Sequence, residues 1–347
     1  MRKLVLILAL LPFLGCGGGS SNGPPAAATV TVSVSPAVVT VPAGQSQAFL
    51  ATVGGTSNSA VTWTVLPASS GAISSGGLFT AASTAGTCSV RATSSADPAA
   101  YGQASVTVTA AAPTRILFLH HSTGGNVWNG GVATWFQAYN QDHGSDYRIS
   151  QRAYPDSPYP WANYPYDYWN LWVNHSGDNL AQGQDTLERL LTGADVIVFK
   201  HCFPVSDIVP DSGIANVASA TQSQENYRAQ YAALKTKLRQ FPSRKFVVWT
   251  GAALVQSATT AQKAQRARDF FNWVKTVWDE PGDNIFLWDF YELETEGGLY
   301  LKDAYASGGG DSHPNPGFCT QVAPYLGQRL VNVIEGRGDS TRIDGKN

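Results

Sequence analysis

Five short apolar runs in the last two-thirds of the chain limit its fold more than any other feature of the sequence. Four are apolar almost throughout and lie at 116–120, 196–199, 246–249 and 285–288, while a weaker one lies at 147–150. A run without polar alternation is typical of a strand in a parallel sheet that is covered on both faces. Such runs, separated by helices, predict an α/β domain with a doubly wound parallel sheet.

Amphipathic helices are predicted between and after these runs. Apolar side chains recur at steps of three and four residues from Tyr227 to Phe241 and from Ala264 to Trp278, and a last helix is expected near 317–335. In doubly wound domains, ligands bind at the carboxyl ends of the strands. Residues just past the strand ends are therefore the first place to look for chemistry.

Charged residues mark a boundary between two domains. Only four of them fall within residues 1–110, namely Arg2, Lys3, Arg91 and Asp97. Residues 28–110 instead alternate apolar and polar residues between Gly-, Ser- and Pro-rich turns, which predicts an all-β sandwich. After a short linker, the α/β domain is expected to run from 113 to 336 and to be followed by a polar tail at 337–347.

The all-β segment resembles a bacterial Ig-like (Big) domain. The likeness rests on Val-Ser-Pro at 34–36, Val-Pro-Ala-Gly at 41–44, Val-Thr-Trp at 61–63 and Gly-Leu-Phe-Thr at 77–80. The resemblance implies a spacer or adhesive module that carries no chemistry of its own.

The first sixteen residues are expected to be an export signal. Arg2 and Lys3 precede an apolar run that is too short to span a bilayer. Phe-Leu-Gly-Cys at 13–16 resembles a bacterial lipobox, which implies that Cys16 carries a lipid and anchors the exported protein in the cell envelope. Residues 17–27 then form a flexible linker. An ordinary secretory signal is the alternative.

The overall composition narrows the class of partner. The chain is 43% hydrophobic and 14% charged, with a net charge of −2. It can therefore bury a core, and it lacks the basic excess that a nucleic-acid partner would require. A membrane is expected as a partner only through the lipid on Cys16.

Two sites past strand ends carry residue types suited to nucleophilic catalysis. Ser122 follows the first apolar run in a Gly-rich turn, where its Oγ and its own N–H can face one carbonyl group. His313 lies in a loop near the other end of the domain, with Asp311 two residues before it. A histidine oriented by a carboxylate is suited to general base catalysis.

These two blocks resemble those of the SGNH (GDSL-type) hydrolases. Ile-Leu-Phe-Leu-His-His-Ser at 116–122 matches the nucleophile block, and Asp-Ser-His-Pro-Asn at 311–315 matches the block of the catalytic histidine. The resemblance implies a flavodoxin-like sheet, no cofactor, and a triad of Ser122 as nucleophile, His313 as base and Asp311 as its orienting acid.

The chain departs from that family at three points. The family usually spaces its Asp and His by three residues rather than two, so Asp303 is an alternative acid. The glycine and asparagine that complete the family's oxyanion hole have no obvious counterpart. Ser122 and Asn126 are the oxyanion candidates, and Lys200 or His201 are substitutes.

Cysteines and histidines near the site raise two further questions. Cys202 and Cys319 are both expected at the rim that holds His313, so in an exported protein they either form a disulfide or remain two separate buried thiols. His201, Cys202 and His313 have no metal-ligand spacing, and no metal is expected.

An aromatic loop suggests the class of substrate. Residues 154–172 hold eight aromatic side chains, which either stack against sugar rings or pack the loop onto the domain. Candidate substrate-binding residues are Tyr159, Trp161, Tyr164 and His201. The sequence thus predicts an exported serine esterase that acts on carboxylic esters such as acylated polysaccharide. A non-catalytic carbohydrate-binding or adhesion lipoprotein is the alternative.

Overall fold

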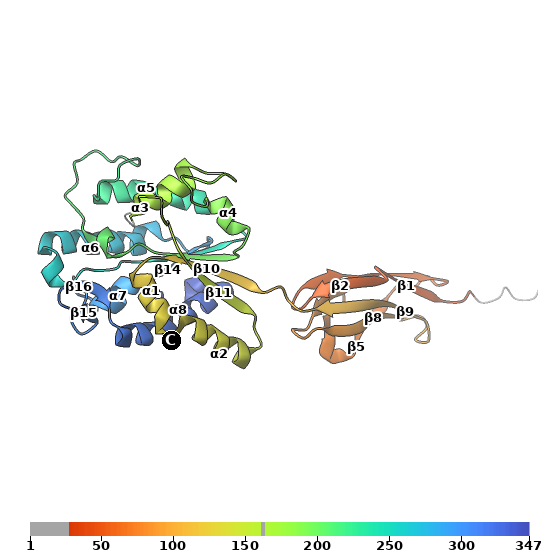
Figure 1. The fold of residues 1–347 in the computed structure, drawn as a ribbon. Coiled ribbons are helices and arrows are strands. Elements are labelled where there is room, and N and C mark those ends of the chain that lie inside the picture. Colours follow the sequence, from red (N-terminus) through yellow and green to blue (C-terminus); the bar gives the residue numbers. More distant parts are fainter. Residues whose placement is uncertain (1–27, 161–163, 347) are drawn as a thin grey trace, which may run out of the picture. The chain divides into compact units, whose positions relative to one another are not determined.

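The computed structural model describes residues 28–160 and 164–346. The chain divides into two compact units, Met1–Ala111 and Ala112–Asn347 (Figure 1). Cys16, the linker at 17–27 and Trp161 lie outside the described residues, so the expectations placed on them stay predictions. Within the described residues, no helix has the length and apolar character needed to cross a bilayer.

The N-terminal unit is all-β in its described part, residues 28–111. Its largest sheet has the strand order β2-β9-β8-β5, and two smaller sheets have the orders β1-β4 and β3-β7-β6. Side chains from all three sheets, among them Val34, Phe79 and Val106, meet in one buried core. The strands are β1 (Thr31–Ser35), β2 (Val38–Pro42), β3 (Ser46–Ala48), β4 (Leu50–Gly54), β5 (Val61–Leu66), β6 (Gly71–Ile73), β7 (Leu78–Ala81), β8 (Gly86–Ser94) and β9 (Tyr101–Thr109).

The C-terminal unit is an α/β domain built on a parallel sheet of five strands. The strand order is β11-β10-β12-β13-β14, and all four pairings are parallel. The strands are β10 (Thr114–His120), β11 (Tyr147–Ala153), β12 (Val196–Phe199), β13 (Lys245–Trp249) and β14 (Ile285–Trp288). Each predicted apolar run is therefore confirmed as a strand, and the order places the first strand inside the sheet.

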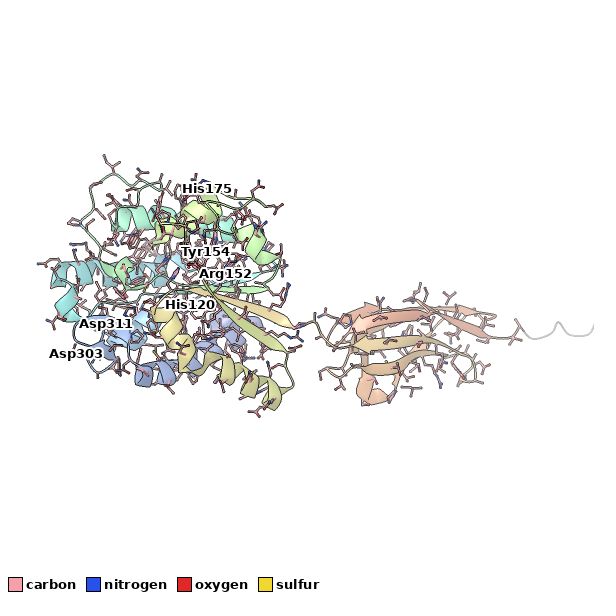
Figure 2. All side chains as sticks on the ribbon, viewed as in Figure 1. His120, Arg152, Tyr154, His175, Asp303 and Asp311 are labelled. Carbon is pink, nitrogen blue, oxygen red and sulfur yellow. The ribbon has the colours of Figure 1, made fainter. Side chains whose placement is uncertain are left out.

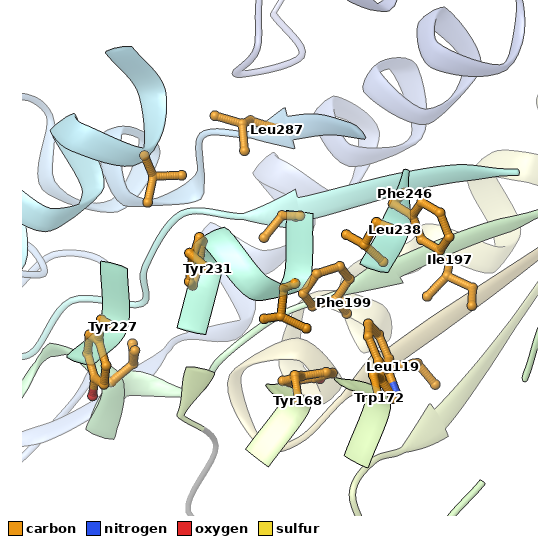
Figure 3. Close-up of a cluster of buried hydrophobic side chains, with 14 of the residues drawn as sticks. Leu119, Tyr168, Trp172, Ile197, Phe199, Tyr227, Tyr231, Leu238, Phe246 and Leu287 are labelled. Carbon is orange, nitrogen blue, oxygen red and sulfur yellow. The ribbon is translucent and has the colours of Figure 1, made fainter. Parts of the chain in front are cut away.

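Successive side chains of each strand point to opposite faces of the sheet, so both faces carry apolar side chains. Helices cover both faces. Leu119, Phe199 and Leu287 face one cluster, which Figure 3 shows in close-up, and Phe118, Val198 and Trp288 face the other. The first face is covered by α3 (Pro165–Trp169), α4 (Leu187–Leu191), α5 (Gln224–Leu238) and α6 (Ala261–Trp273). The second is covered by α1 (Thr123–Val127), α2 (Ala133–His143), α7 (Phe290–Thr295) and α8 (Pro316–Ile334). The doubly wound arrangement thus follows the predicted pattern.

The segment predicted as a polar tail belongs to the same compact unit as the α/β domain. Residues 337–346 pack onto the domain instead of leaving it. Arg329 is 1% exposed and donates to the Gly338 carbonyl (2.6 Å), and the Trp288 indole donates to the Asp344 carbonyl (3.1 Å). A buried guanidinium needs several acceptors, and this polar segment supplies two of them, the Gly338 carbonyl and the Thr341 hydroxyl.

Candidate active site

Ser122 sits in a strained turn between β10 and α1. Its φ is 46° and its ψ is −100°, and a positive φ is uncommon for any residue with a side chain. The turn is fixed by the Gly124 N–H, which donates to the His121 carbonyl (2.9 Å), and by the Asn126 N–H, which donates to the Ser122 carbonyl (3.0 Å). Ser122 is exposed, so this sharp strand-to-helix turn presents its hydroxyl at the carboxyl end of the sheet.

Close packing beneath the turn explains why residue 124 is a glycine. A Cβ added at Gly124 would lie 2.4 Å from the Cβ of His120 and 2.9 Å from the Cδ of Lys200. A Cβ at the neighbouring Gly125 would come no nearer than 3.5 Å to any atom. Only Gly124 is therefore needed for α1 to start this close to the strand end.

Asp311 and His313 lie on one short strand, β16 (Asp311–Pro314), which pairs with β15 (Ala306–Gly308). Side chains two residues apart on a strand share a face. Ser312, between them, is buried and accepts a hydrogen bond from the Val255 N–H (3.1 Å). The spacing of two residues, unusual for the family that the sequence resembles, thus places both side chains on the same side.

The three side chains form one chain of hydrogen bonds. With Nδ1 protonated, His313 donates to Asp311 Oδ1 (2.6 Å), which also accepts from the His313 backbone N–H (3.0 Å). His313 Nε2 is then a base, and it contacts the Ser122 hydroxyl. The bonds from His313 hold the pKa of Asp311 below its ordinary value, so its carboxylate is stabilised in the ionised form.

Asp303, the alternative acid, is an exposed residue ahead of β15, and Figure 2 labels it together with Asp311. The carboxylate bonded to His313 is that of Asp311. Just after His313, the Asn315 side chain caps α8 by accepting from the Phe318 N–H (2.9 Å), and Pro316 begins the helix. This cap fixes where β16 ends, and so fixes the histidine.

A cavity of about 290 Å³ opens next to Pro314, the residue that follows His313. Asn126 forms part of its wall, and its side-chain amide donates to the Pro314 carbonyl next to His313 (3.4 Å). The cavity is lined by Asn126, Asn129, Gly130, Ser307, Pro314, Pro316, Cys319 and Thr320. Amides and hydroxyls make up half of this lining.

Two neighbours of the site are absent from the sequence-based prediction. The Phe203 ring meets the His313 ring edge-on at 5.0 Å between centroids, and Gln151 Oε1 lies 2.8 Å from His120 Nε2 below the turn. Phe203 follows β12 and Gln151 lies near the end of β11, so the rule that chemistry gathers past strand ends points to both. Neither carries a motif that would single it out.

Several predicted site residues are buried away from the site. His201 is wholly buried, its Nε2 lies 3.1 Å from the Tyr231 hydroxyl, and burial lowers its pKa to about 3. Tyr159 is 5% exposed and donates to Asp167 Oδ1 (3.2 Å). Neither can contact a substrate at the Ser122 turn, so both predictions are wrong. Tyr164 stays half-buried against the same core.

Of the two possibilities for Cys202 and Cys319, the structure contradicts the disulfide, because both are free, buried thiols. Cys202 Sγ lies 3.5 Å from the Thr123 hydroxyl under the turn, whereas Cys319 lies on α8 and lines the cavity. Burial raises the pKa of Cys319 to about 12, so its thiol stays protonated. Within residues 28–160 and 164–346, no cluster of His, Cys, Asp or Glu side chains is arranged to hold a metal ion.

Comparisons with known proteins add little to this geometry. No family model matches the chain, and neither does any curated protein. Among solved structures, a gut microbial diltiazem-metabolizing enzyme is 11% identical, with a TM-score of 0.36 over 65% of this chain and 47% of its own. A sialyltransferase from Photobacterium damsela is 12% identical, with a TM-score of 0.19 over 80% of this chain and 60% of its own. The chain spans about half the length of the first, and neither TM-score supports an argument about function.

Proposed function

We propose that the C-terminal unit is a serine hydrolase of the SGNH type that cleaves carboxylic esters. One observation carries the proposal: the hydrogen-bonded chain from the exposed Ser122 hydroxyl through His313 to Asp311. It lies at the carboxyl end of a parallel sheet, where α/β domains bind their ligands. The strained turn at Ser122 supports the same reading, because nucleophiles of α/β hydrolases occupy such turns.

In the proposed reaction, Ser122 Oγ attacks the ester carbonyl while His313 Nε2 takes its proton. As the C=O double bond becomes a single bond, the carbonyl oxygen becomes an oxyanion, which the Ser122 N–H stabilises. His313 returns the proton to the leaving alcohol as the C–O bond breaks and an acyl-serine forms. A water molecule then attacks the acyl group with His313 again as base, which releases the acid and restores Ser122.

We propose a hydroxyl-rich alcohol, such as an acylated polysaccharide, as the leaving part of the substrate. The cavity lined by Pro314 supports it, because Asn129, Ser307 and Thr320 in its wall offer amide and hydroxyl groups to sugar hydroxyls. The export signal and lipid anchor predicted at Cys16, and the Ig-like spacer predicted at 28–110, would place this activity at the cell envelope. Asn129→Leu should raise KM for an acetylated polysaccharide while leaving KM for an aryl acetate unchanged, and equal effects on both would contradict this choice.

Hydrolysis of a short-chain aryl acetate by the purified protein tests the reaction itself. Ser122→Ala should reduce turnover to the background rate. Ser145→Ala is the matched control, because Ser145 precedes β11 at the opposite end of the sheet. Absent turnover, or equal turnover in the Ser122→Ala variant, would contradict the proposal and favour a binding protein.

A further inference from the structure

Lys200 is a buried charge that the proposed reaction does not use. It follows β12 directly, its side chain is wholly buried, and its Nζ donates to the His121 carbonyl (3.1 Å). Burying an ammonium group is costly unless it is hydrogen-bonded and paired. A lysine at this position therefore calls for an explanation in terms of what it holds.

The carbonyl that Lys200 contacts belongs to the peptide between His121 and Ser122. In a trans peptide the C=O and N–H point in opposite directions. Lys200 and the Gly124 N–H both bind this carbonyl from within the domain. The N–H of the same peptide, that of Ser122, is thereby directed away from the buried groups, and it is the N–H that the proposed reaction assigns to the oxyanion.

Burial lowers the pKa of the Lys200 ammonium group, and the acidic groups that face it act against that shift. Cys202 and Glu294 are the acidic groups that interact with it, and His120 is close enough for Lys200 to lower its pKa. Burial raises the pKa of the Cys202 thiol, but Lys200 and the hydrogen bonds from Thr123 outweigh that effect and bring it below its ordinary value. Burial keeps the pKa of the Glu294 carboxyl group well above its ordinary value, which favours its neutral form.

We propose that Lys200 is a positioning residue for ester hydrolysis, which aims and polarises the Ser122 N–H toward the oxyanion by binding the His121 carbonyl from inside the domain. This inference rests on the proposed function. A cation bound at the carbonyl oxygen draws electron density through the peptide, so its N–H becomes a stronger donor. The sequence-based idea that Lys200 donates to the oxyanion directly is wrong, because its side chain has no exposed surface.

The test compares Lys200→Met with wild type in two measurements on the full chain. The first is kcat and KM for an aryl acetate. The second is the inhibition constant of an alkyl boronic acid, whose tetrahedral adduct with Ser122 places a negative oxygen where the oxyanion forms. We expect kcat to fall roughly 10- to 100-fold with little change in KM, short of the roughly 10²- to 10³-fold typical when an oxyanion donor is lost. The boronate inhibition constant should rise by a similar factor.

Lys237→Met is the matched control. Lys237 is 7% exposed and pairs with Glu188 on the other side of the sheet from α1. The Lys237→Met variant should have a lower melting temperature and an unchanged boronate inhibition constant. If Lys200→Met does not fold, Lys200→Gln, which keeps an uncharged donor, takes its place in both measurements. Wild-type kcat and boronate affinity in the folded Lys200 variant would overturn this inference alone, whereas turnover that does not depend on Ser122 would overturn the proposed function and the inference together.

Discussion

Replacing Asp311 by Asn is the sharpest perturbation of the proposed triad. The change keeps the shape of the side chain and its acceptor oxygen, but removes the negative charge that lies 2.6 Å from His313 Nδ1. During the reaction His313 becomes positively charged, and the carboxylate stabilises that charge only once it has formed. The loss should therefore appear in kcat more than in KM.

The size of the effect follows from how exposed the pair is. The side chain of Asp311 is 47% exposed and that of His313 is 26% exposed, so solvent screens their attraction in part. Two unit charges about 4 Å apart interact by about 1 kcal/mol in water and about 4 kcal/mol near a protein surface. That range corresponds to a loss of roughly 5-fold to roughly 10³-fold in kcat. It lies below the roughly 10⁴-fold loss typical of a buried triad acid.

The assay is aryl acetate hydrolysis by Asp311→Asn and by the control Asp303→Asn. Because the pKa of Asp311 lies below its ordinary value, its carboxylate is ionised throughout the neutral range. The charge that the variant lacks is therefore present in the wild type from about pH 6 to about pH 9, and kcat of the variant should be lower at every pH in this range. A neutral effect of Asp311→Asn together with a large loss in Asp303→Asn would refute this assignment of the acid.

Three further predictions concern packing, charge and thiols. Gly124→Ala should lower kcat at least tenfold and lower the melting temperature, because its Cβ meets His120, whereas Gly125→Ala should do neither; equal effects would contradict the packing argument. Burial raises the pKa of Asp279 to about 6, so the folded state binds this proton more tightly than the unfolded state, and stability falls as pH rises from about 4 to about 6. Asp279→Asn should therefore raise the melting temperature at pH 7.5 but not at pH 4, and an equal shift at both would count against it. Protein that is unfolded without reduction should react with iodoacetamide at both Cys202 and Cys319, as measured by mass spectrometry. Failure of both thiols to react would indicate a disulfide between them.

The sheet could be predicted from the sequence because each strand is recognisable from its own residues. The apolar composition of the runs at 116–120 and 196–199 by itself indicates that they are buried, and both form strands inside the sheet. The helix patterns ending at Phe241 and Trp278 were also correct to within a few residues, as α5 ends at Leu238 and the helical segment after α6 ends at Trp278. Period and composition suffice for such elements.

The site could be predicted from the sequence only in part, because it depends on the directions in which side chains point. Ser122, Asp311 and His313 are predicted from their places past strand ends together with the family resemblance of their two blocks, and the structure brings them together. Lys200 and His201 are neighbours in the same loop, yet one supports the turn and the other faces the opposite core. No local pattern distinguishes them, since the direction of each side chain follows from the twist of β12 and the helices packed on it.

Covalent labelling of Ser122 tests the central claim most directly. An alkyl fluorophosphonate reacts with a serine only when a neighbouring base activates it, and its adduct survives proteolysis and peptide mass spectrometry. We predict one adduct per chain, on the peptide that contains Ser122, and its loss in both the Ser122→Ala and the His313→Ala variants. An unlabelled protein, or a label that persists on another residue in Ser122→Ala, would contradict the account.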